Sequence, residues 1–441
     1  MRNVLMIAFD FPPMGGGAVM RISKFVNEYK PIILTTDKVN YDPVDKSLYY
    51  EVCKNKIYRV KNLNIYKKFS NKIKMNSGIN KDENLEYIER DSIKLLILKK
   101  LKEIKNSCAK NFLIPDSSVI WARKAFKEAV NIIKNNNVDL IFVTSPPHGI
   151  QLLALKLKKE FPYIPLIIDF RDGWTINPLY KSSNKFKEKL EKIYEENLVK
   201  CANKIVCATE PIEKSYTIIY KKYASKFCTI TNGYDGENYN FNRNNYIRNN
   251  KLVIMYTGSI GSKGVQAKYF LKACENIVKN REIKENLRII FIGNFSEDKL
   301  YWSNKLNGNI EFKSLIPQKD IIEYTEKADL LMLTFTSRQG GKTVLTGKIF
   351  EYLAARRPIL GLVPDSAAKD FILNNNLGFC CEPTNIRAIE YTIKKIYELW
   401  KNNQLYIKPD IKLIKKYDRK ILTKKLAYLF DNLLNDKNKI I

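Results

Sequence analysis

The chain has 441 residues, which is long for one domain and fits two domains of roughly 200 residues each. Hydrophobic residues make up 45% of it, which excludes global disorder, and the formal net charge of +30 favours polyanions or phosphorylated molecules as partners. Eight cysteines without a CxxC pair and a single histidine argue against a zinc site.

The chain opens with an apolar run that leads through three glycines into a helical pattern. Val4–Phe9 is short, apolar and partly β-branched, which is typical of a buried parallel strand. The apolar residues between Val19 and Tyr29 have helical spacing. Gly15–Gly17 lie between the two and can direct backbone N–H groups at an anion near the helix start. A flexible loop without a ligand is the alternative.

Apolar runs alternate with helical patterns along the rest of the chain. In the first half we predict further strands at Ile32–Thr35, Tyr58–Val60, Leu140–Ser145, Pro165–Arg171, Lys204–Thr209 and Thr229–Thr231. In the second half we predict strands at Leu252–Thr257, Arg288–Ile292, Glu311–Ser314, Leu330–Phe335, Pro358–Val363 and Gly378–Cys381. This alternation predicts an α/β protein with two doubly wound, Rossmann-like parallel sheets that face each other across a cleft. The polar stretch from Asn232 onward is the expected linker, so we expect domains at residues 1–235 and 236–404.

One basic segment stands apart from this alternation. In residues 93–104 the apolar positions share one helical face, and lysines border that face. Such a helix can lie on an anionic membrane, although an ordinary helix packed on its own domain is the alternative. No apolar stretch reaches about 18 residues and no signal-peptide pattern is present, so we expect a cytoplasmic protein with this segment at the inner membrane face.

Two glycine-bearing turns in the second half suit a phosphate group. In "YTGSIGSKG", residues 256–264, Lys263 can reach a phosphate placed at the start of the next helix, or can be a solvated side chain. In "SRQGGKTVLTGKIFEYLAARRPIL", residues 337–360, Gly347 precedes a helix whose first turn holds Lys348 and Glu351. The Glu351 carboxylate can accept hydrogen bonds from a ribose diol, or can serve only as a helix cap.

Two further strand ends in the first half carry polar residues. "VTSPPHGIQ" places His148 just after a strand, where it either contacts a substrate or is structural. "IIDFRDGWTINPLY" places Arg171, Asp172 and Trp174 after another strand. Its two aspartates, Asp169 and Asp172, do not form a DxD metal motif, and an ion pair of Arg171 with either of them is the structural alternative.

In order and spacing, these motifs resemble the family 4 glycosyltransferases, which have the two-domain GT-B fold. The resemblance rests on "FPPMGGGAVMR", "TSPPH", "DFRDGWT", "TNGYD", "YTGSI", "KADLLML" and "GKIFEYLAARRPIL" and covers nearly the whole chain. It implies retaining transfer of a sugar from a nucleoside-diphosphate sugar, with a UDP-sugar as the expected donor, and no cofactor or obligatory metal. The expected acceptor is a hydroxyl of a glycan or a polyprenyl-phosphate-linked glycan in cell-surface polysaccharide assembly. The last helices, about 405–441, are expected to pack back on the first domain.

The resemblance also implies roles for individual residues. Donor binding is expected of Gly16, Gly17, Ser259, Lys263, Gly347, Lys348 and Glu351. The residues expected to be catalytic are His148 and Asp172, and those expected to contact the acceptor are Arg171 and Trp174.

Two positions depart from the family pattern. The first of two glutamates separated by seven residues would stand at 343, where this chain has Thr343, and the arginine of the loop before the phosphate lysine is replaced by Ser259. A non-catalytic, nucleotide-binding subunit is therefore one alternative, and a nucleotide-sugar 2-epimerase is another. A nucleic-acid-binding protein is disfavoured, because the lysines are spread along the chain and no nucleic-acid motif is present.

Overall fold

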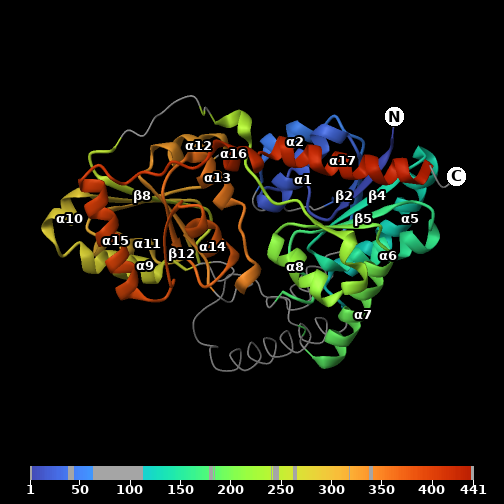
Figure 1. Ribbon diagram of the computed structural model, residues 1–441, viewed down its shortest axis with the longest axis horizontal. Coiled ribbons are helices and arrows are strands. Elements are labelled where there is room, and N and C mark those ends of the chain that lie inside the picture. Colours follow the sequence, from blue (N-terminus) through green and yellow to red (C-terminus); the bar gives the residue numbers. More distant parts are fainter. Residues whose placement is uncertain are drawn as a thin grey trace, which may run out of the picture.

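Two parallel sheets, each with helices on both faces, make up the computed structural model of the protein (Figure 1). The structure describes residues 2–37, 44–62, 113–177, 182, 184–239, 241, 248–261, 266–316, 318–336 and 341–438. Among these residues the strand order is β3-β2-β1-β4-β5-β6-β7 in one sheet and β10-β9-β8-β11-β12-β13 in the other. We call the first sheet and its helices the first unit, and the second sheet and its helices the second unit.

The inner strands of both sheets are apolar runs that are largely buried on both faces, whereas the edge strands β3, β7, β10 and β13 are partly exposed. The first sheet consists of β1 (Val4–Ala8), β2 (Ile32–Asp37), β3 (Ile57–Lys61), β4 (Leu140–Ser145), β5 (Leu166–Phe170), β6 (Lys204–Cys207) and β7 (Phe227–Thr229). The second consists of β8 (Leu252–Thr257), β9 (Leu287–Ile292), β10 (Ile310–Lys313), β11 (Leu330–Thr334), β12 (Ile359–Leu362) and β13 (Gly378–Cys381). The predicted strands are thus confirmed, with β7 beginning two residues earlier than expected.

Alternating side chains of each strand serve two separate cores. In β1, Leu5 and Ile7 point into the core beneath α5 (Ser118–Asn136) and α6 (Gln151–Glu160). Val4 and Met6 point to the opposite core. That core is formed with α1 (Gly17–Tyr29), α2 (Lys46–Val52) and the last helix, α17 (Arg419–Asn438). The remaining helices of the first unit are α7 (Lys185–Cys201) and α8 (Glu210–Ile219).

The second unit repeats this layered plan. One face of its sheet is covered by α9 (Lys268–Ile277), α11 (Lys299–Lys305) and α15 (Ile386–Lys401). The other face is covered by α12 (Gln318–Lys327), α13 (Lys348–Ala355), α14 (Ala367–Asn374) and α16 (Ile411–Lys416), and α10 (Arg281–Asn286) precedes β9.

The chain crosses between the units twice, and the two crossings lie side by side. The N–H group of Tyr234 donates to the carbonyl oxygen of Tyr417 at 3.1 Å, and the N–H group of Arg419 donates back to Tyr234 at 2.9 Å. Beyond this pairing, α17 packs along α1 in the first unit (Figure 1). The domain boundaries expected at residues 235 and 404 stay a prediction.

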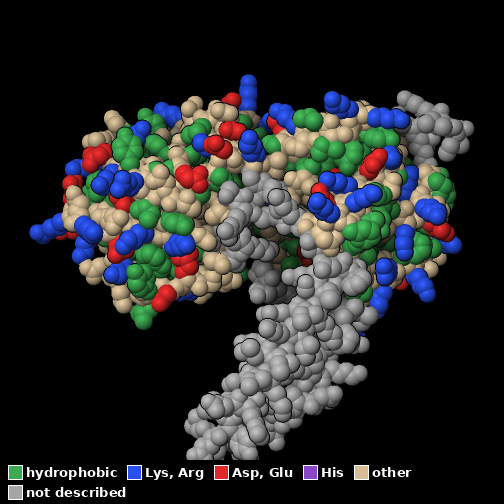
Figure 2. Space-filling view, turned by 90° about the horizontal axis from the view of Figure 1, so that it is seen from below, with side chains coloured by type: hydrophobic (Ala, Val, Ile, Leu, Met, Phe, Trp, Pro, Cys, Tyr) green, Lys and Arg blue, Asp and Glu red, His purple; other side chains and the backbone are tan. Residues whose placement is uncertain are grey.

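The strand order reverses direction beside β1 in the first sheet and beside β8 in the second. Ligands of such sheets bind outside the carboxyl ends of the strands at the reversal point. Figure 2 shows the surface hollowed where the two units meet. On the same face, lysines and arginines are scattered over both units instead of gathering in one patch.

No helix in the described part of the chain is long and apolar enough to cross a bilayer. The basic segment at 93–104 lies outside the described residues.

Candidate functional site

The glycine turn after β1 opens the start of α1 to its surroundings. Gly16 precedes the helix with a φ of 109°, a conformation that favours glycine. A Cβ atom added to Gly16 or Gly17 would meet no other atom within 4 Å. The N-terminus of α1 therefore offers unobstructed backbone, as the donor-binding prediction for these two glycines requires.

His148 lies in the short helical turn after β4 and is buried, with 1% of its surface exposed. Its ring stacks on Trp174, with centroids 5.3 Å apart and planes within 3° of parallel. Burial, together with the nearby Arg171 charge, lowers the pKa of His148 to about 3. The imidazole is therefore neutral at physiological pH and suits hydrogen bonding better than proton donation.

The carboxylate of Asp116 fixes the backbone of this turn. One of its oxygens accepts hydrogen bonds from the N–H groups of His148, at 2.8 Å, and Gly149, at 3.1 Å. Asp116 is a residue that sequence reasoning missed, because it lies far from His148 along the chain.

The residues predicted to bind the acceptor lie beside His148 but are largely packed into the first unit. Arg171 donates through Nη2 to the carbonyl oxygen of Pro146, and burial lowers its pKa while the charge of Asp169 opposes that effect. Trp174 is 1% exposed, and its backbone N–H group donates to the Tyr216 hydroxyl at 2.7 Å. Contact between an acceptor and the Trp174 ring therefore requires movement of this loop. Asp172, in contrast, is exposed.

A buried ion pair ties α1 to β5. Arg21 Nη2 lies 2.8 Å from Asp169 Oδ1, and the same guanidinium donates to the carbonyl oxygens of Ile230 and Thr231. The Thr144 hydroxyl donates to the other oxygen of Asp169 at 2.7 Å. The buried partner of Asp169 is thus Arg21, where the sequence suggested Arg171 as the structural alternative.

The turn after β8 brings several predicted donor residues together. Lys348 Nζ donates to the Tyr256 hydroxyl at 3.0 Å and lies 4.4 Å from the centre of that ring. Gly258 has a φ of 123°, a conformation that favours glycine, and Lys348 Nζ lies close to the position that a Cβ atom would take. Ser259 follows and is half-buried. Burial lowers the pKa of Lys348, and its ammonium lies at the strand end where a diphosphate is expected.

Lys263 lies outside the described residues, so its predicted contact with the diphosphate stays a prediction.

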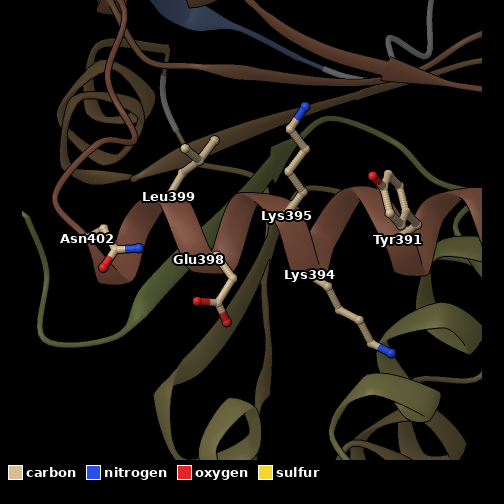
Figure 3. Close-up of a pocket in the computed structure, with 6 residues that line it drawn as sticks. All are labelled: Tyr391, Lys394, Lys395, Glu398, Leu399 and Asn402. Carbon is tan, nitrogen blue, oxygen red and sulfur yellow. The ribbon is translucent and has the colours of Figure 1, made fainter.

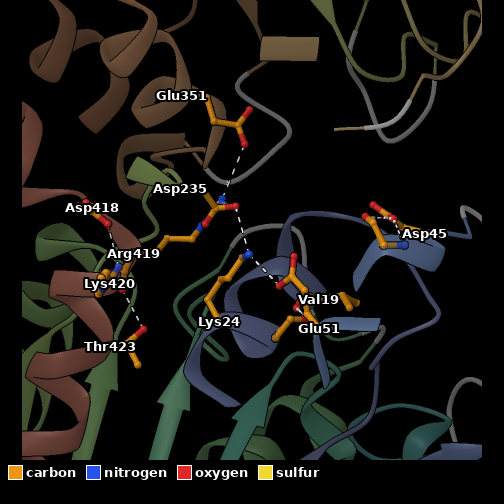
Figure 4. A network of polar contacts seen from close by, with 12 residues as sticks. Val19, Lys24, Asp45, Glu51, Asp235, Glu351, Asp418, Arg419, Lys420 and Thr423 are labelled. Carbon is orange, nitrogen blue, oxygen red and sulfur yellow. Dashed lines mark hydrogen bonds and ion pairs between the residues drawn. The ribbon is translucent and has the colours of Figure 1, made fainter. Parts of the chain in front are cut away.

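Glu351 lies in the first turn of α13, as the sequence predicted, and its side chain is 16% exposed. Its Oε1 lies 3.7 Å from Nη2 of Arg419, the first residue of α17 (Figure 4). Gly347 precedes the helix and is half-buried, near Asn232 of the first crossing. Sequence reasoning missed Arg419, although an arginine at the start of the last long helix was visible in the sequence.

Thr343, at the position of the missing family acid, lies at the boundary between the units. Its carbonyl oxygen accepts a hydrogen bond from the hydroxyl of Thr209 at 3.2 Å. Thr209 also caps α8 in the first unit. The segment before α13 therefore rests on the first unit through this contact.

A cavity of about 450 Å³ lies away from these residues. It is lined by side chains of α15 and of the residue that follows it, which point to both sides of the helix in Figure 3: Tyr391, Lys394, Lys395, Glu398, Leu399 and Asn402. A site needs polar groups that converge from several elements, which a single helix does not supply. No group of three or more metal-ligating side chains occurs in the residues that the structure describes.

Comparisons with known proteins agree with this architecture. Residues 239–410 match the family model described as glycosyl transferases group 1. No curated protein matches the chain. The chain is similar to Alr3699/HepE of Anabaena in complex with UDP and glucose, with a TM-score of 0.56, 12% identity, and coverage of 98% of this chain and 100% of that one. It is also similar to a glycosyltransferase of Rickettsia africae, with a TM-score of 0.58, 14% identity, and coverage of 98% of each chain.

A third similar structure is WaaG, a glycosyltransferase involved in lipopolysaccharide biosynthesis. Its TM-score is 0.54 at 11% identity, over 97% of this chain and 99% of that one. At these identities the structures show the fold, and the match to the glycosyl transferases group 1 model covers residues 239–410, most of which lie in the second unit. The expectations of a GT-B fold and of a glycosyltransferase are thereby confirmed.

Proposed function

We propose that this GT-B chain, whose residues 239–410 match the glycosyl transferases group 1 model, is a retaining glycosyltransferase that uses a nucleoside-diphosphate sugar. The observation that carries the proposal is the position of Lys348 and Glu351 in the first turn of α13, beside the end of β8. The UDP and glucose in the HepE structure support a UDP-sugar as the donor. The proposed acceptor is a hydroxyl of a glycan or lipid-linked glycan in cell-surface polysaccharide assembly, used in the cytoplasm at the inner membrane face.

In this proposal a cation binds the diphosphate of the donor and a hydrogen-bond acceptor binds its ribose. The Lys348 ammonium and the start of α13 attract the diphosphate, while the Glu351 carboxylate accepts hydrogen bonds from the ribose hydroxyls. Gly16 and Gly17 bring the N-terminus of α1 to the same ligand from the first unit.

Transfer passes through an oxocarbenium-like transition state. The bond between the anomeric carbon and the diphosphate oxygen breaks, and the acceptor oxygen bonds to the same face of the sugar. The proton of the acceptor hydroxyl passes to the leaving phosphate, whose negative charge grows as the bond breaks. Lys348 and the helix N-termini therefore stabilise the transition state more than the ground state, and no metal ion is required. His148, which is neutral at physiological pH, is a hydrogen-bond partner for the sugar in this proposal after the Trp174 loop that stacks on its ring moves aside.

A thermal-shift screen with UDP, GDP, CDP, ADP and dTDP in the presence of EDTA tests the proposal. We expect one diphosphate to stabilise the protein without a metal and the matching nucleotide sugar to be consumed when acceptor is supplied. The Glu351→Ala variant should lose this stabilisation. Its matched control is Glu398→Ala, because Glu398 is an exposed glutamate of α15 and should not affect it. Stabilisation by no diphosphate would refute the proposal.

A non-catalytic, nucleotide-binding subunit is the second candidate. It is favoured by Thr343, which replaces an acid of the family and instead contacts Thr209 through its backbone. Stabilisation by one diphosphate without turnover over a panel of lipid-linked acceptors would favour this candidate.

A further inference from the structure

A row of alternating charges connects the proposed ribose site to the first unit (Figure 4). Glu351 of α13 faces Arg419, whose Nη1 lies 3.1 Å from Oδ2 of Asp235 in the first crossing. Lys24 of α1 lies 3.6 Å from the same Asp235 oxygen and 2.7 Å from Glu51 of α2. We call these five residues the crossing relay.

Arg419 is the central cation of the crossing relay, and its backbone is held firmly. Its N–H group donates to Tyr234 across the paired crossings, and its carbonyl oxygen accepts from the Thr423 hydroxyl at 2.8 Å. Its side chain is about one-tenth exposed. The cavity beside it has a volume of about 10 Å³, which holds about one water molecule and no nucleotide. The guanidinium is therefore placed for the two carboxylates and not for a ligand of its own.

The geometry allows Arg419 to orient the Glu351 carboxylate without using all of its hydrogen-bond acceptor positions. At 3.7 Å, the contact between Arg419 Nη2 and Glu351 Oε1 is an ion pair that is longer than a hydrogen bond. An ionised carboxylate has about four acceptor positions, so this ion pair does not use up its capacity for ribose hydroxyls. The rigid fork of arginine can meanwhile hold Asp235 with one nitrogen and face Glu351 with another.

We infer that Arg419 is a positioning residue that orients the Glu351 carboxylate toward the ribose diol of the donor and links this contact to the paired crossings. This inference rests on the proposed function. Because Asp235 also contacts Lys24 of α1, the same relay joins the helix that begins at Gly17 to the ribose contact.

The test compares a diphosphate with its 2′-deoxy form, which lacks one of the two hydroxyls. Calorimetry would measure the dissociation constants of UDP and 2′-deoxy-UDP, or of the diphosphate selected in the screen and its 2′-deoxy form, for the full chain and its variants. We expect Arg419→Gln to weaken the binding of UDP about tenfold and that of 2′-deoxy-UDP only about threefold, because the 2′-deoxy form keeps one of the two hydroxyls that Glu351 would bind. Arg419→Lys keeps the charge but not the fork, so we expect the binding of UDP to weaken about threefold and that of 2′-deoxy-UDP less than twofold.

Arg288→Gln is the matched control, because it removes an arginine–glutamate pair with Glu311 that is exposed in the same unit. We expect it to change neither affinity. If the Arg419 variants weaken the binding of both ligands equally, or do not weaken the binding of UDP, the inference is overturned and the proposed function stays intact. Should Arg419→Gln fail to fold, Arg419→Lys alone decides by the same comparison. A wild-type chain that binds neither diphosphate would refute the inference together with the proposed function.

Discussion

Replacing Arg21 by methionine should destabilise the first unit strongly, because it leaves the Asp169 carboxylate buried without its cation. The Arg21 side chain is 3% exposed and that of Asp169 is fully buried. The carbonyl oxygens of Ile230 and Thr231 would lose their donor as well. Breaking such a buried pair from one side costs about 3–5 kcal/mol. For a unit of this size we expect the melting temperature to fall by roughly 10 °C.

The assay is thermal and urea denaturation of wild type, Arg21→Met, Asp169→Asn and the double variant. Asparagine removes the buried charge, and its side-chain oxygen can still accept the hydrogen bond from Thr144. The double variant should therefore recover a large part of the loss caused by Arg21→Met. Lys192→Met provides the control for an exposed ion pair, that with Glu188, and should cost less than about 1 kcal/mol. If Arg21→Met costs no more than this control, the ion pair does not hold α1 to β5.

Three further predictions concern the candidate site. Glu351→Ala should weaken diphosphate binding by about 1.5–3 kcal/mol through loss of the ribose hydrogen bonds, measured by calorimetry against Glu398→Ala. Lys348→Gln should weaken binding of UDP and of inorganic pyrophosphate alike, whereas Lys395→Gln on α15 should affect neither. Burial lowers the pKa of His148 to about 3, below its value of about 6.5 in an unfolded chain. The free energy of unfolding is therefore unaffected by this ring above pH 6.5 and decreases as the pH falls from 6.5 toward 3. The chain has one histidine, so its ring signals in proton NMR are unambiguous, and a titration midpoint near pH 6.5 would contradict the buried position.

The inner strands were predictable from the sequence because they are nearly continuous apolar runs with both faces buried. Lys348 and Glu351 were placed correctly in the first turn of α13, since a glycine-bearing turn between a strand and an amphipathic pattern marks a helix start. These features depend on neighbours in the sequence.

The contacts that hold the site were not predictable in the same way. Arg21 and Asp169 are separated by 148 positions, and their pairing depends on which face of α1 the sheet covers. The same is true of Arg419 and Glu351, which meet only because the two crossings lie side by side. Trp174 was expected at an acceptor surface, but the nearby His148 ring offers a stacking partner that covers it. In each case the contact partner is determined by tertiary packing between residues that are far apart in the sequence.

The position of α17 has a consequence for the order of events during synthesis. Leu422, Leu426 and Phe430 complete the core that Phe142 of β4 and Phe25 of α1 begin. The first unit is therefore contiguous in space but split in sequence, with the whole second unit inserted before its last helix. On the ribosome the second unit can form its core before α17 has been synthesised. The apolar residues of the first unit that α17 covers therefore stay exposed until residues near 434 emerge. A fragment ending at residue 235 would leave the part of that face that α17 covers exposed, and fusing residues 419–438 to the fragment would be the way to obtain the first unit alone.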